Sequence, residues 1–246
     1  MEMHDILGQE LAKRAIEIAL AGQHSILFIG PGGNGKYTLA CAMEKLALKI
    51  SNQKFTVHKM KNIHTKTLEE NQNVYFPLPE DKILAGTSLP CDCGKCGDPI
   101  MQCLCSSIKK ERFINKLSPL LDNIPIRVEV PRLPFEKLSM DGRAPEDASV
   151  ILKRIETAQQ IQIDSQDGVL NGVLDQVKML RSPRFEKPKE AYALLKRALD
   201  IVGFSVNEYL QILRVSRTIA DLAGHTKLEL QDIAEAIQYK FTIKES

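Results

Sequence analysis

A glycine-rich segment, GPGGNGKYT, occupies residues 30–38 and joins two apolar stretches. Residues 25–29 (SILFI) form a short, continuous apolar run, which is typical of a strand buried on both faces of a parallel sheet. Residues 37–50 repeat apolar side chains at helical spacing. A strand, a glycine-rich turn and a helix in this order predict a phosphate-binding loop, because backbone N–H groups, a helix N-terminus and a lysine can then surround an anion.

The competing interpretation is a glycine-rich turn without a ligand. Strand, framing glycines, spacing, lysine, nearby hydroxyl and helix all coincide, which favours phosphate binding. The predicted contacts are Gly30, Gly32, Gly33, Asn34, Gly35, Lys36, Tyr37 and Thr38.

One position departs from the phosphate-loop pattern. The residue after the lysine normally carries a hydroxyl that ligates Mg²⁺, and here it is Tyr37, whose phenol is too long and rigid for that place. Thr38 lies one residue further, about 100° around the helix, so it could substitute only if the first turn shifted. We therefore expect the loop to bind ATP, whereas the residue at position 37 argues against Mg²⁺ binding.

Strand and helix patterns alternate in the first half of the chain. Residues 54–60, 82–87 and 126–130 read as further strands, and the segment before Gly22 and residues 65–71 and 106–117 as helices. After residue 134 the patterns at 145–163, 189–202, 206–222 and 229–239 are all helical. We predict an α/β core with a parallel sheet at residues 1–134 and a small all-helical lid domain at 135–246.

Composition limits the class of protein. The 246 residues are 43% hydrophobic and 26% charged with a net charge of +2, which indicates an ordinary globular chain and identifies no partner by charge. Acidic residues within the first 22 positions argue against a secretory signal, and no run is long enough to cross a membrane. We predict a cytoplasmic protein without membrane contact. No GxSxG or HExxH motif supports another chemistry.

Five of the six cysteines cluster in a loop at residues 90–106. Two Cys-x-Cys pairs within it, Cys91 with Cys93 and Cys103 with Cys105, could surround a structural Zn²⁺ tetrahedrally, leaving Cys96 as an extra thiol. The alternative is a set of reduced cysteines in an exposed loop, since Cys-x-Cys is tighter than the usual knuckle.

Several separated motifs occur in one order along the chain. They are GQ at residues 8–9, KRA at 13–15, AGQH at 21–24, PCDCG at 90–94, PLLD at 119–122, VEVPRL at 128–133 and RVSRTIADLAG at 214–224. In these the chain resembles the magnesium-chelatase-like AAA+ family, in its ComM-type (YifB-type) branch. The resemblance implies an ATPase core, a helical lid and assembly into a ring with copies or relatives of the chain, and in the ComM-type branch remodelling of branched DNA in recombination. Among the motif residues we place Gln9 and Arg217 at the nucleotide, with a solvated or structural role for Arg217 left open.

The hydrolytic residues of that family are missing at several places. The long segment with the acidic Walker B pair, expected between the phosphate loop and the cysteines, is absent. The pair Glu80-Asp81 follows a run with two prolines, which argues against a central strand. Leu89 stands at the sensor asparagine position.

Three arginine positions are also changed, to Asn123, Asn207 and Gln211. Without these groups little phosphoryl chemistry remains, whereas binding through the loop can survive. We therefore predict an ATP-binding, weakly hydrolysing or inactive member with a regulatory or structural role in a ring. An active DNA-remodelling ATPase and a zinc-stapled adaptor without nucleotide remain as alternatives.

Overall fold

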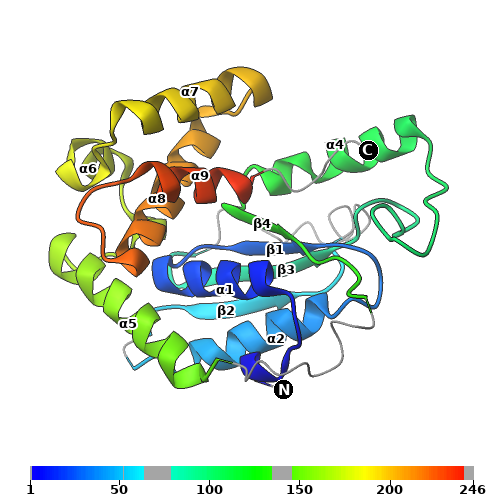
Figure 1. Cartoon of the computed structure of the whole chain (residues 1–246), viewed down its shortest axis with the longest axis horizontal. Coiled ribbons are helices and arrows are strands. Elements are labelled where there is room, and N and C mark those ends of the chain that lie inside the picture. The colour runs from blue at the N-terminus through cyan, green and yellow to red at the C-terminus, as the bar shows by residue number, and fades with distance from the viewer. Residues whose placement is uncertain (1, 52, 64–78, 135–145, 241–246) are drawn as a thin grey trace.

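The computed structural model describes residues 2–51, 53–63, 79–134 and 146–240. Four parallel strands form one sheet in the order β2-β3-β1-β4 (Figure 1). The strands are β1 (Ile26–Ile29), β2 (Thr56–Met60), β3 (Lys82–Ser88) and β4 (Ile126–Glu129). Because all four run in the same direction, their carboxyl ends meet at one edge, here called the P-loop edge.

Helices cover both faces of the sheet. Alternate residues of β1 point to opposite faces: Ile26 and Phe28 join the core under α1 (Glu10–Gly22) and α2 (Lys36–Ala47), whereas Leu27 and Ile29 pack with α4 (Ser107–Leu121). All four β1 residues are buried, as the continuous apolar run predicted. The predicted parallel α/β core is confirmed.

The boundary of α4 differs from the prediction. The helix was expected to end at residue 117, but it continues through Pro119 to Leu121. Leu120 and Leu121 are buried against the sheet, and this packing holds the last turn helical despite the proline. The helix predicted at residues 65–71 lies outside the described residues.

The described residues after β4 contain helices and no strand. They form α5 (Ala148–Ser165), α6 (Gln176–Arg181), α7 (Lys189–Val202), α8 (Val206–Ala223) and α9 (Leu230–Gln238), and the chain also has short 3₁₀ turns at Met3–Asp5, Asn171–Val173 and Pro183–Phe185. The predicted start of α8 is confirmed, because Ser205 and Glu208 form a reciprocal capping box. None of the helices in the described ranges has the length and apolar character that crossing a bilayer requires.

A polar cluster, here called the lid latch, joins α8 to the end of α4. The side-chain amides of Asn207 and Gln211 each donate to the Asp122 carbonyl oxygen at 2.9 Å. Lys240 Nζ donates to Gln211 Oε1 at 2.5 Å and to the Ile124 carbonyl oxygen at 3.2 Å. The helical part is therefore fixed to the core by hydrogen bonds as well as by apolar packing.

The latch predicts a pH dependence of stability. Burial, with a smaller effect of Arg127, lowers the pKa of Lys240 to about 7, against opposing effects of Glu208 and Asp122. An unfolded lysine keeps its proton up to a pKa of about 10.4, so between those values the unfolded chain binds more protons and the free energy of unfolding rises with pH. The contribution is up to about 1.4 kcal/mol per pH unit.

We expect Lys240→Met to remove this slope. Denaturant unfolding of both proteins between pH 7 and pH 9.5 measures it. Parallel pH profiles for wild type and Lys240→Met would contradict the burial of a neutral amine.

Candidate phosphate and metal sites

The glycine-rich loop leaves the end of β1 and enters α2 as predicted. Gly33 and Gly35 have φ angles of +81° and +79°, a left-handed conformation that glycine adopts without strain. A Cβ atom on Gly32, Gly33 or Gly35 would meet no atom within 4 Å, so this side of the loop is open. Backbone N–H groups at an open loop and the first turn of α2 are suited to surround an anion.

Lys36 closes the loop from within. Its ammonium donates to the carbonyl oxygens of Gly30 at 2.7 Å and Pro31 at 2.5 Å, and its side chain is buried. Burial lowers the pKa of Lys36. An arriving phosphate would offer this cation a charged acceptor in place of two neutral carbonyls, and such charge-assisted bonds are stronger.

The segment after β4 supports the loop. A Cβ on Gly30 would lie 2.2 Å from the Val130 carbonyl oxygen, so only glycine fits there. Asn34 Nδ2 donates to the same oxygen at 3.4 Å, and Gln9 Nε2 donates to the Pro131 carbonyl oxygen at 2.9 Å. Gln9 and Asn34, predicted as nucleotide contacts from distant parts of the sequence, are thus held by adjacent carbonyls beside the loop.

The rejected acidic pair lies at the wrong edge of the sheet. Glu80 and Asp81 directly precede β3, and the Asp81 carbonyl oxygen accepts from Thr56 N at the start of β2. The P-loop edge lies at the other end of β3, and seven residues of parallel strand span about 23 Å. Neither carboxylate can approach an anion held near Lys36.

Among the described residues, β3 and β2, on one side of β1, present no acid where they end at the P-loop edge. Thr87 and Ser88 end β3, and both hydroxyls are engaged: Thr87 Oγ1 accepts from Asn62 N at 2.8 Å, and Ser88 Oγ donates to the Leu89 carbonyl oxygen at 2.9 Å. Lys61 follows β2, and its ammonium lies 5.4 Å from the centre of the Tyr37 ring. Sequence reasoning missed this contact.

β4 brings one carboxylate to this edge. Glu129 is exposed and pairs in register with Ile29, the residue before the loop. Its Oε1 points toward Gly97 of the cysteine loop, 3.4 Å from where a Cβ would stand. Glu129 belongs to the VEVPRL motif at residues 128–133, and nothing in the sequence alone marked it as part of the site.

The three positions that lack arginine have structural partners instead. Asn123 Nδ2 donates to the Pro119 carbonyl oxygen at 2.8 Å and so caps the end of α4. Asn207 and Gln211 belong to the lid latch described above. All three amides are therefore used within the chain.

Arg217 lies inside the helical lid. Its side chain is 0% exposed, and Nε donates to Asp221 Oδ1 at 3.0 Å. The Nη atoms donate to the carbonyl oxygens of Arg184 at 2.9 Å, Thr226 at 3.3 Å and His225 at 2.5 Å. This geometry favours the structural role that the sequence left open over contact with a nucleotide.

The four predicted zinc ligands converge. The Sγ atoms of Cys91, Cys93, Cys103 and Cys105 all lie within 4.8 Å of one another. Three of the separations are 3.5, 3.8 and 3.6 Å, and a tetrahedron with Zn–S bonds of about 2.3 Å requires about 3.8 Å. Cys96 contributes only its amide, which donates to Cys91 together with that of Lys95. The spacing fits a closed four-thiolate zinc site.

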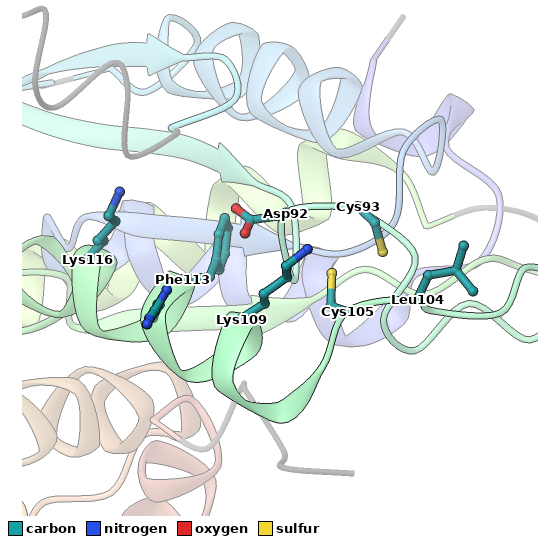
Figure 2. Close-up of a pocket in the computed structure, with 8 residues that line it drawn as sticks. Asp92, Cys93, Leu104, Cys105, Lys109, Phe113 and Lys116 are labelled. Carbon is teal, nitrogen blue, oxygen red and sulfur yellow. The ribbon is translucent and has the colours of Figure 1, made fainter.

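An open cavity of ≈ 540 Å³ adjoins the cysteine cluster. Figure 2 shows the sulfur atoms of Cys93 and Cys105 at one end and the side chains of α4 along one wall. Three of the wall residues are cations at helical spacing, so one face of α4 is basic. The lining residues are Asp92, Cys93, Leu104, Cys105, Lys109, Arg112, Phe113 and Lys116.

The fold and the loop define a P-loop α/β protein with a helical lid, and comparison with known proteins agrees. The profile of the family "Magnesium chelatase, subunit ChlI" matches residues 2–79 and 67–138, and that of its C-terminal region matches residues 145–240. The chain belongs to this magnesium chelatase family. The first profile matches in two pieces, so the family pattern is interrupted between the loop and the cysteine cluster.

Relatives support the ComM/YifB-type branch. Competence protein ComM of Haemophilus influenzae is 27% identical over 312 positions, covering 99% of this chain and 61% of ComM. YifB of Escherichia coli is 24% identical, covering 97% of this chain and 60% of YifB. The chain thus spans about three fifths of the length of these relatives. At least 66 positions of the alignment with ComM face gaps in this chain, in agreement with a shortened middle.

Proposed function

We propose that this chain is an ATP-binding member of the family that hydrolyses ATP weakly or not at all and acts as a regulatory or structural subunit of a ring assembly. The observation that carries the proposal is the contrast between the loop and its surroundings. The glycine conformations and Lys36 suit polyphosphate, while every predicted hydrolytic position in the described residues holds a group of different chemistry.

Three parts of that contrast are independent of one another. Tyr37 replaces the hydroxyl that would ligate Mg²⁺, and it is 40% exposed at the start of α2. At the P-loop edge, β2 is followed by the cation Lys61 and not by a carboxylate that could hold Mg²⁺. Asn207 and Gln211 tie the lid to Asp122 and so cannot stabilise charge on a transferring phosphoryl group. Binding through backbone N–H groups depends on none of these side chains.

The cysteine cluster gives the proposal a structural component. A closed four-thiolate zinc site has no open position, so zinc would hold the loop at residues 90–106 rather than catalyse. α4 begins at Ser107, two residues after the last ligand, and the intervening Ser106 caps the helix by accepting from Lys109 N. Zinc would therefore fix the start of the helix that the lid latch holds at its other end.

The direct test is titration with a fluorescent ATP analogue beside a phosphate-release assay. We expect wild type to bind, Lys36→Ala to lose most of that binding, and Lys45→Ala to bind as wild type does. Lys45 lies on the same helix but is exposed, so it is a control for the loss of one positive charge. Phosphate release should not exceed that of Lys36→Ala. No binding by wild type would overturn the proposal and favour the zinc-stapled adaptor.

A second candidate function is an active ATPase that remodels DNA. Two observations favour it: Glu129 brings a carboxylate to the P-loop edge, and Lys109, Arg112 and Lys116 make one face of α4 basic. Phosphate release that branched DNA stimulates, and that Glu129→Gln abolishes while nucleotide still binds, would establish this candidate over the first.

A further inference from the structure

Alternate side chains of β2 face α2 and form a row that ends beside the phosphate loop. Val57 packs into the core under α2, and Lys59, two residues on, pairs with Glu44 of α2 at 2.5 Å. Lys61, two residues further, lies over the Tyr37 ring at 5.4 Å. Along β2 toward the P-loop edge, the contacted residue of α2 changes from Glu44 to Tyr37, which lies in the first turn of the helix. Lys61 is therefore located next to the phosphate loop.

Tyr37, which Lys61 contacts, occupies the position of the Mg²⁺-binding residue. Tyr37 directly follows Lys36, and in a metal-dependent phosphate loop the side chain at this place carries the hydroxyl that binds Mg²⁺. That metal bridges the β- and γ-phosphate oxygens and neutralises their charge. In this chain an aromatic face occupies the position and holds an ammonium group, since a ring attracts a cation at such a distance.

Lys61 has a fixed backbone and an exposed side chain. Asn62 N donates to Thr87 Oγ1 at 2.8 Å, and Ile63 N donates to the Thr87 carbonyl oxygen at 2.7 Å, so the chain after β2 is pinned to the end of β3. The Lys61 side chain is exposed, and no carboxylate of the described residues pairs with it. Lys59, by contrast, is neutralised by Glu44.

We propose that the Lys61 ammonium takes the electrostatic place of Mg²⁺, so that this chain binds the polyphosphate of ATP without a divalent cation. The inference rests on the proposed function and deepens it by naming the charge that completes the site. Two positive charges then lie at the first turn of α2: Lys36, bound to the loop carbonyls, and Lys61, over the ring of the next residue. A lysine is a compact point charge with flexible reach, which suits contact with phosphate oxygens.

The test compares nucleotide binding with and without metal. ATP affinity of the full chain is measured by calorimetry in excess MgCl₂ and in EDTA, for wild type, Lys61→Ala, Lys61→Arg and Lys82→Ala. Lys82 is an exposed lysine at the opposite edge of the sheet, so its variant makes the same charge change away from the loop. We expect wild type to bind in EDTA within about twofold of its affinity in MgCl₂, a difference worth under about 0.5 kcal/mol.

The variants separate the role of Lys61 from that of the loop. Lys61→Ala is expected to weaken binding in EDTA about tenfold, the range of one charge-assisted hydrogen bond, and Lys61→Arg and Lys82→Ala to remain close to wild type. Wild type that binds only with Mg²⁺, or Lys61→Ala that binds as wild type does in EDTA, would overturn the inference while leaving the proposed function in place. Wild type that binds under neither condition would overturn both.

Discussion

Replacing Cys103 with serine is expected to reduce bound zinc from about one per chain to almost none, because a structural site needs four ligands. The four Sγ atoms already have the spacing of a tetrahedral thiolate site. Zinc content is measured by elemental analysis of gel-filtered protein. Cys96→Ser is the matched control: Cys96 lies in the same loop but outside the cluster, so that variant should keep its metal.

The same variant should lose stability. Zinc held by the four thiolates would join the end of β3 to the start of α4, and Cys91 is fully buried at that junction. Loss of the metal is expected to lower the unfolding temperature of Cys103→Ser by roughly 5–10 °C, equivalent to a few kcal/mol for a chain of this size. Wild type without zinc, or equal zinc in Cys103→Ser and Cys96→Ser, would contradict the four-thiolate assignment.

The second large effect is expected at Arg217. Arg217→Ala removes a fully buried cation and leaves Asp221 buried, with Arg184 and Asn171 as its remaining partners. Breaking a buried pair by removing one partner costs about 3–5 kcal/mol. The retained Arg184 contact places the expected loss in the free energy of unfolding near the lower end, about 3 kcal/mol. Denaturant unfolding measures this difference.

Arg197→Ala is a suitable control for Arg217. Arg197 is an exposed arginine of α7, and its loss should change the free energy of unfolding by less than about 0.5 kcal/mol. ATP affinity of Arg217→Ala, measured where it is still folded, should stay close to wild type. Unchanged stability combined with lost ATP binding would return Arg217 to the nucleotide site and contradict the structural role.

Local patterns predicted the elements that position the phosphate loop. The apolar run of β1, the glycines and the apolar spacing of α2 act over a few residues, so the sequence alone indicated them. The Cys-x-Cys pairs likewise predicted their own convergence, because each pair is a short local unit and a single loop joins the two. The capping box of Ser205 and Glu208 is local as well.

Contacts between distant segments could not be predicted in this way. Nothing near Lys61 in the sequence indicates Tyr37, since only the order of strands in the sheet places β2 beside α2. The environment of Arg217 depends on three carbonyl groups from two separate turns of the lid, at Arg184 and at His225 and Thr226. Asn207 and Gln211 could be recognised as departures from the family pattern, but their partner Asp122 lies 85 and 89 residues away in the chain.

Identification of the nucleotide that stays with the protein tests the central claim most directly. The full chain is incubated with excess ATP and MgCl₂, passed rapidly through a gel-filtration column, denatured, and its released nucleotide is separated by ion exchange. The account predicts that wild type retains ATP, that Lys36→Ala retains almost none, and that Lys45→Ala behaves as wild type. Recovery of ADP from wild type, or of no nucleotide at all, would contradict it.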